Sequence, residues 1–250
     1  MMDRPGLGSG SAVPVDAVSF DAEALRARSV AFAAGHGLPM AEGERDGIPL
    51  VTSPARLRSE AAAVNRAVVL SVVLTCAYGF PKARALRWLE REQVLGAVRD
   101  LEMQFLSNTY TDKALFYDQV EALWALAWGL SLVDDFRWDA HCGKSLATHF
   151  PELNDAGRRS AFAAKCTLRP AAALIEEADR AEVLHAAMST RPAPESARGK
   201  TVELYTYVQP PTVEVDPEAP PRPLGGVLPF ALAERRRALR WLVGGRAWYD

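Results

Sequence analysis

Apolar residues are most concentrated between 117 and 135, and this stretch indicates the centre of the fold. Within 122–133 the only residues that are not apolar are Gly129 and Ser131. A helix that is apolar on every side has no face to offer to water, so the pattern predicts a central helix surrounded by other helices. The run is too short to cross a bilayer, which takes about 20 apolar residues.

Apolar residues at helical spacing predict two helices before this stretch. The first covers about 17–34, with Asp16 or Ser19 near its cap. The second begins at the Ser-Pro pair at 53–54, a capping hydroxyl followed by proline, and continues to about Tyr78. Its second half is rich in β-branched residues, so a buried strand is the competing interpretation there. We favour a helix because no turn signal separates the two halves.

The same spacing predicts shorter helices in the rest of the chain, at 86–98, 101–106, 158–167, 171–188 and 229–243. Asn154 and Asp155 are the expected cap of the helix at 158–167, and Pro170 opens the next one. The segment from Trp138 to Phe150 is expected to be irregular or weakly helical. The sequence therefore predicts a mostly α-helical fold.

The composition changes between 191 and 229, where nine of the 17 prolines lie. Inside this segment 201–208 alternates in the manner of a strand, and 212–215 is a candidate second strand, so we predict a small β-hairpin. An isolated hairpin is marginal in water and must pack on the helices or on another chain. Residues 1–15 are predicted to be a disordered tail, and 16–250 a single helical domain.

Charge and cysteine content restrict the classes of partner and the cellular compartment that we expect. A net charge of -2 over 250 residues argues against a nucleic-acid partner, which usually shows as a basic excess or stripe. The first residues lack the apolar region of a signal peptide, and we expect no membrane partner. Cys76, Cys142 and Cys166 form an odd and widely spaced set, which predicts reduced thiols in a cytoplasmic protein.

Three ordered motifs carry a likeness to a known family. They are EALWALAWGL at 121–130 with Asp134, then Leu168-Arg169 and LIEEAD at 174–179 with His185, and ERRRALRWL at 234–242 with Trp248. On these motifs the chain, from about Ala22 onward, resembles a bacterial family of uncharacterised proteins catalogued as domain of unknown function 4272. The resemblance implies a mostly helical fold, a cytoplasmic bacterial origin and no agreed activity. Ala186 stands where the family pattern has tryptophan, and the segment 191–229 is longer than the usual connection.

Familiar catalytic motifs are missing from the sequence. It has no phosphate loop, no nucleophile elbow and no H-E-x-x-H metal helix. His141, Cys142 and His149 lie close together, and Cys166 and His185 are further candidate metal ligands. Their spacing matches no standard zinc pattern, so we favour hydrogen-bonded histidines and buried thiols, with no metal or cofactor.

Carboxylates and tryptophans supply the candidate site. The residues proposed for a pocket or a buried polar network are Glu121, Trp124, Trp128, Arg169, Glu176, Asp179, His185, Glu234 and Arg235. A carboxylate desolvated by indole can act as a base or bind a cation. The alternative, which we favour, is a Glu–Arg network that fixes the packing of three helices, with Arg169, Arg235 and Arg240 as ready partners.

Three functions remain open at this point. The first, which we favour, is a cytoplasmic binding or interaction protein that acts through a surface or through the edge of the strand at 201–208. The second is a small-molecule-binding protein or enzyme with a pocket near Glu121, Arg169, Glu176 and Asp179. The third is a structural subunit of an assembly. The first is preferred because the sequence contains no recognisable catalytic constellation.

Overall fold

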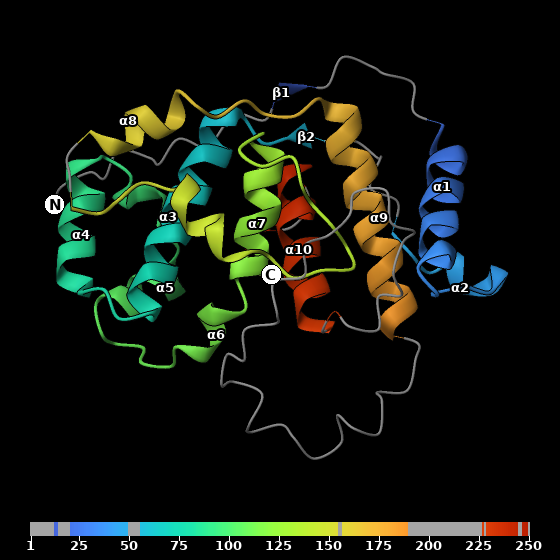
Figure 1. The fold of residues 1–250 in the computed structure, drawn as a ribbon, viewed down its shortest axis with the longest axis horizontal. Coiled ribbons are helices and arrows are strands. Elements are labelled where there is room, and N and C mark those ends of the chain that lie inside the picture. Colours follow the sequence, from blue (N-terminus) through green and yellow to red (C-terminus); the bar gives the residue numbers. More distant parts are fainter. Residues whose placement is uncertain are drawn as a thin grey trace, which may run out of the picture.

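The described part of the chain is mostly α-helical in the computed structural model (Figure 1). The described residues are 13–14, 21–49, 56–154, 157–189, 227, 229–244 and 247–249. The predicted hairpin at 201–215 lies outside them, as do most of the predicted tail at 1–15 and almost all of the proline-rich segment.

The elements follow one another in a simple order. The helices are α1 (Ala22–Gly35), α2 (Glu42–Arg45), α3 (Glu60–Ala77), α4 (Lys82–Arg91), α5 (Asp100–Leu106), α6 (Ala114–Tyr117), α7 (Val120–Gly129), α8 (Arg158–Ala163), α9 (Ala171–Ser189) and α10 (Pro229–Leu242). Two 3-10 turns, η1 (Leu95–Ala97) and η2 (Lys144–His149), separate some of them. The short strands β1 (Val13–Pro14) and β2 (Arg56–Leu57) pair antiparallel, with Val13 opposite Leu57.

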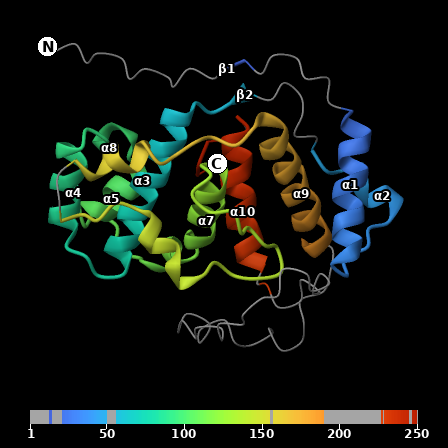
Figure 2. The same cartoon turned by 45° about the horizontal axis from the view of Figure 1, so that its top comes forward.

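Helices α7 and α10 lie side by side in the middle of the molecule (Figures 1 and 2). Helix α9 packs on α10 and α1 packs on α9, while α3 and α4 continue the row on the other side of α7. The two central helices run in the same direction, because Glu121 faces Arg235 near one end and Gly129 faces Leu242 at the other. The middle of the row is therefore built from segments more than 100 residues apart.

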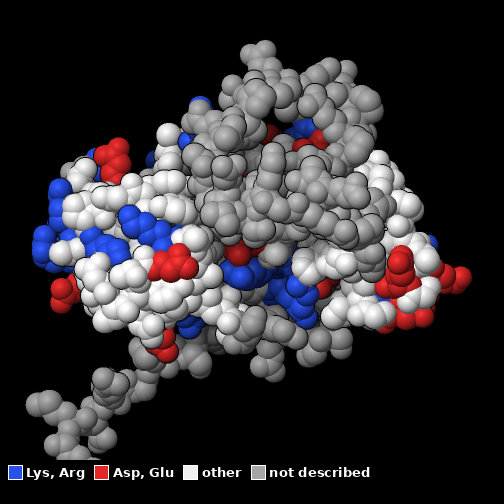
Figure 3. Space-filling view, turned by 90° about the horizontal axis from the view of Figure 1, so that it is seen from below, with Lys and Arg blue, Asp and Glu red and all other residues white. Residues whose placement is uncertain are grey.

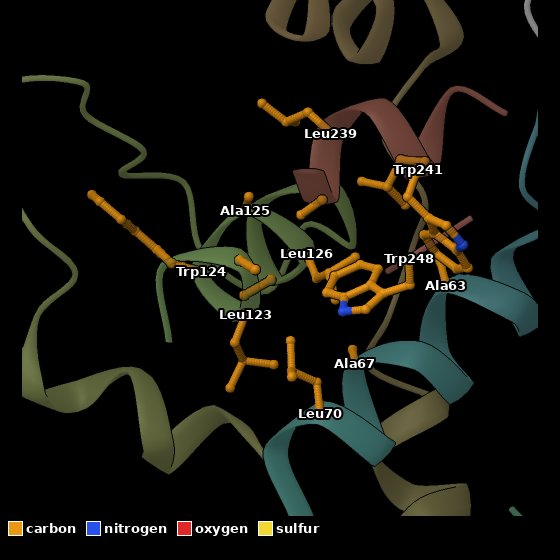
Figure 4. Packing of buried hydrophobic residues seen from close by; sticks show 14 of the residues in the cluster. Ala63, Ala67, Leu70, Leu123, Trp124, Ala125, Leu126, Leu239, Trp241 and Trp248 are labelled. Carbon is orange, nitrogen blue, oxygen red and sulfur yellow. The ribbon is translucent and has the colours of Figure 1, made fainter. Parts of the chain in front are cut away.

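The predicted central helix is confirmed as α7, whose residues from Glu121 to Ala127 are all buried. Figure 4 shows Leu123 and Leu126 on the side of α7 that faces Trp248 and Leu70 of α3, while Trp124 points the other way. The predicted ends were too wide. Residues 114–117 form a separate turn, and α7 stops at Gly129 because Ser131 adopts a left-handed φ of 55° that ends the helix.

Two predicted helix starts were wrong by several residues, and the helix predicted to start at Arg158 does start there but has a different cap. Helix α1 begins after Asp21, whose side chain accepts a hydrogen bond from the Ala24 backbone N–H at 3.0 Å. Helix α3 is capped by Ser59 instead of the Ser-Pro pair at 53–54, and α8 follows Gly157, not Asn154. Several Ser, Asp and Asn residues precede each helix, and any of them has a suitable capping group. The choice between them depends on where the helix packs.

Helix α3 settles the choice between helix and strand in favour of helix. By length and composition it is the one helix among the described residues that is apolar enough to cross a membrane. In the structure 72% of it is buried inside the protein. Its neighbours on several sides are α4, α5, α6 and α7, so this apolar surface is covered by other helices of the bundle.

Candidate functional site

A buried ion pair joins the two central helices. Arg235 on α10 donates from Nε and Nη2 to the Glu121 Oε2 atom on α7, at 2.9 and 2.7 Å. The side chains are 0% and 2% exposed. A pair buried this deeply is tolerable only when the remaining donors and lone pairs are also satisfied.

The loop at 136–142 supplies partners for the remaining hydrogen-bonding groups of Arg235 and Glu121. Arg235 donates its other N–H groups to the carbonyl oxygens of Arg137 at 2.7 Å and Ala140 at 2.6 Å. Its guanidinium lies over the ring of Trp124, with 4.6 Å between the guanidinium carbon and the ring centroid, and close to Phe136 and Trp138. A flat, weakly hydrated cation suits such aromatic surroundings. Arg235 thereby fixes the loop onto both helices.

The loop places His141 against the buried carboxylate. His141 Nδ1 is 3.0 Å from Glu121 Oε1, and the Cys142 backbone N–H donates to the same oxygen at 3.2 Å. Burial by itself would raise the pKa of Glu121, but the hydrogen bond with His141 and the Arg235 guanidinium outweigh burial and hold that pKa below its usual value. The His141 side chain is 23% exposed, so it links the buried pair to the surface.

Glu177 on α9 supports the same loop from the opposite side. It accepts a hydrogen bond from the Trp138 indole N–H and pairs with Arg180 at 2.6 Å. Burial raises the pKa of Glu177, although Arg180 opposes the shift. Glu177 was not among the site residues predicted from the sequence. The sequence pattern that could have identified Glu177 is its spacing, three residues after Leu174 and four before Ala181, which places it on the apolar side of α9.

The structure divides the other candidates among separate contacts. Asp179 is fully buried and pairs with Arg26 of α1 at 2.7 Å. Glu176 is half-buried and pairs with Arg180 at 3.1 Å. Arg169 stacks on Trp128, with 4.8 Å between the guanidinium carbon and the ring centroid, and donates to the carbonyl oxygens of 128 and 133. The structure brings together Glu121, Trp124 and Arg235 and places these other side chains elsewhere.

Two further candidates lie on or near α10. Glu234 is buried and pairs with Arg237 at 2.9 Å. Burial raises the pKa of Glu234 to about 7, with Arg237 opposing the shift and Asp118 adding to it. His185 on α9 is half-buried, and its pKa is lowered by burial and by the nearby Arg236.

The cysteines and histidines do not converge. All three cysteines are free thiols, and burial raises the pKa of Cys76 and of Cys166 to about 11. Burial also raises the pKa of Cys142, far above its usual value. Such thiols are poor nucleophiles because little thiolate forms. In the part of the chain that the structure describes, no three His, Cys, Asp or Glu side chains are placed to hold one metal ion.

The fold and this site define a mostly α-helical protein whose two central helices are joined by a buried glutamate–arginine pair under a surface histidine. The model of the family described as a domain of unknown function, DUF4272, matches residues 26–250, so the chain belongs to this family. The resemblance inferred from the three motifs is thus confirmed. No curated protein and no solved structure matches the chain.

Proposed function

We propose that the protein is a cytoplasmic binding protein that docks a different protein through one side of its helix row, where the ends of several helices lie. The carboxylates that a catalytic pocket would need are engaged in structural contacts. Glu121, Glu102 and Asp179 are almost fully buried and each pairs with an arginine. Groups committed in this way stabilise the packing of helices and are not free to act on a substrate. This favours binding over catalysis.

The main support for this function is a set of large hydrophobic side chains exposed to solvent. Among the described residues, the exposed large hydrophobic side chains are Tyr78, Leu115 and Phe230, at 58%, 38% and 37% exposure. Tyr78 directly follows α3, Leu115 lies in α6 and Phe230 in the first turn of α10, and these three places lie along the lower side of the helix row in Figure 1. We call Tyr78, Leu115, Tyr117 and Phe230 the end face. Apolar side chains exposed together mark an interaction surface.

The end face suits a partner that binds through apolar contact. The ring centroids of Tyr78 and Tyr117 are 5.1 Å apart, so the two side chains present one aromatic surface. Aromatic residues are enriched at protein interfaces. Figure 3 views the molecule from this side, and the described residues visible there include separate groups of basic and of acidic side chains. We therefore expect a partner surface that is apolar at its centre and mixed in charge at its rim.

Site-specific photocrosslinking tests the proposal. The photoreactive residue p-benzoylphenylalanine is placed at Tyr78 or at Phe230, and as a control at Ala161, which is exposed on α8, on the upper side of the row in Figure 1. We expect both end-face positions to crosslink to the same protein in cells and Ala161 to give no such product. Phe230→Ser should abolish the product formed at Tyr78.

Two results would contradict this function. Equal crosslinking from Ala161 would show that the contact is not specific to the end face. A product made only of two copies of this chain would replace the distinct partner by self-association. A protein identified at Tyr78 but retained after Phe230→Ser would also place the interface elsewhere.

A further inference from the structure

His141 has one ring nitrogen that the fold fixes and one that it leaves open. Nδ1 lies 3.0 Å from Glu121 Oε1, and the other carboxylate oxygen is taken by Arg235. No group among the described residues is within hydrogen-bond distance of Nε2. Arg235 therefore fixes both Glu121 and the loop at 136–142, and these two together hold the imidazole of His141 in place near the surface.

The protonation pattern follows from the partners. Arg235 and His141 keep Glu121 ionised, and an ionised carboxylate only accepts hydrogen bonds. His141 must therefore donate from Nδ1, and the neutral ring then carries a lone pair on Nε2. The same arrangement, a carboxylate behind a histidine, fixes the tautomer of histidines that bind ligands or accept protons.

Phe230 and the buried pair decide which ligands fit. The Phe230 ring is nearly parallel to the His141 ring, at 26° with 6.2 Å between centroids, and is partly exposed. A lone-pair acceptor beside an exposed flat ring matches a flat ligand that carries one hydrogen-bond donor. The charge of Glu121 is balanced by Arg235, so the support behind His141 favours a neutral ligand over an ion.

We propose that His141 and Phe230 form a binding site for neutral aromatic alcohols, in which the ligand hydroxyl donates to Nε2 and the ligand ring packs on Phe230. The site does not require the protein partner proposed above. Its test reads the histidine ring directly, so the two ideas fail by different observations.

Nuclear magnetic resonance of the protein with ¹⁵N-labelled histidine rings tests the site with phenol and its methyl ether anisole. Phenol should shift the Nε2 signal of His141 in a saturable way, and anisole, which has no donor, should not. His149, which is exposed on η2, is an internal control for nonspecific effects. Phe230→Leu should weaken phenol binding about threefold or more, because an aromatic contact is lost. Leu115→Ala, on the same side of the molecule, should leave it unchanged.

Glu121→Gln reverses the predicted tautomer. Arg235 can only donate and makes two hydrogen bonds to this side chain, so the Gln carbonyl faces Arg235 and the Gln amide N–H faces His141, with loss of the hydrogen bond from the Cys142 backbone N–H. Nδ1 then accepts, the proton moves to Nε2, and phenol affinity should fall about tenfold with the loss of that hydrogen bond. A folded Glu121→Gln variant that binds phenol as the wild type does would overturn the site.

The wild-type protein provides a test that needs no variant. If its neutral His141 carries the proton on Nε2, or if phenol moves His149 and His141 with the same concentration dependence, the proposal is wrong.

Discussion

At the scale of single residues, neighbouring carboxyl groups show how partners decide ionisation. Glu121 is buried but accepts hydrogen bonds from Arg235, His141 and a backbone N–H, and its pKa falls. Glu234 on α10 is also buried, but among the described residues it pairs only with Arg237, whose side chain is 32% exposed and partly screened by water. The pKa of Glu234 therefore rises to about 7. The two buried carboxyl groups shift in opposite directions because the number of partners that stabilise the ionised form differs.

Glu234 should make stability depend on pH. Between pH 4.5, the usual pKa of the group, and about 7 the folded protein holds a proton that the unfolded chain has lost. The stabilising contribution is complete below pH 4.5 and is lost as the pH rises through 7. Relative to wild type, Glu234→Gln should gain up to about 3 kcal/mol between pH 4 and pH 8. Urea unfolding of both proteins at several pH values measures this difference, and a constant difference would refute the assignment.

At the scale of elements, a buried ion pair joins helix α1 to α9. Arg26 donates to both oxygens of Asp179 on α9 and also to the carbonyl oxygen of Ile48 at 3.2 Å. Asp179 is fully buried, so no water replaces the guanidinium if it is removed. The neighbouring Arg28 makes a longer contact of 3.6 Å to Glu176 and is 56% exposed. The two arginines therefore offer a matched comparison on one helix.

Arg26→Ala should destabilise the protein by about 3–5 kcal/mol, because it leaves a buried charge without a partner. Arg28→Ala should cost no more than about 1 kcal/mol, as expected for an exposed pair. Denaturant unfolding measures both values. Equal losses from the two variants would mean that α1 is held by apolar packing and not by the ion pair.

The close approach of α7 and α10 depends on a glycine. A Cβ atom at Gly129 would lie 2.7 Å from Cδ1 of Leu242. Cδ1 is the end of a flexible side chain, but Leu242 is 1% exposed and has little room to move aside. Overpacking a core costs about 1–3 kcal/mol, against a gain of up to about 1 kcal/mol from replacing glycine by alanine at the end of a helix. Gly129→Ala should therefore lower stability by about 1 kcal/mol. Leu242→Val combined with it should recover part of the loss, and strictly additive losses would show that the two side chains do not clash.

At the scale of the whole molecule, the residues near 248 close the core against helices from the first half of the chain. Trp248 is 1% exposed, lies under Arg66 of α3 and donates to Gln119. Tyr249 donates to Glu102, which also pairs with Arg66. These contacts join α3, α5 and the start of α7 to a segment more than 120 residues later. Folding of the helix row therefore requires both halves of the chain.

Trp248→Ala should destabilise the protein by about 3–5 kcal/mol, the usual cost of truncating a buried tryptophan. It also leaves the amide of Gln119 without its indole partner. Tyr78→Ala, which removes an exposed ring that contacts Tyr117, should cost no more than about 1.5 kcal/mol. Thermal unfolding of the two variants gives the comparison. A small loss from Trp248→Ala would show that α3 and α7 pack without this side chain.

The mostly helical fold and the burial of 121–127 could be predicted from the sequence, and Glu121 and Arg235 could be named as candidates for a pocket or a polar network. Apolar spacing and runs are local properties, and a helix that is apolar on all sides can only be stable inside. Which acidic side chain pairs with which arginine became known only from the arrangement of the helices in space. Glu121 and Arg235 are 114 positions apart, and Asp179 meets Arg26 across 153. Such pairings depend on how the helices cross, and the local spacing of apolar residues does not encode the crossing. The contact of His141 with Glu121 likewise depends on the path of the loop in the folded protein.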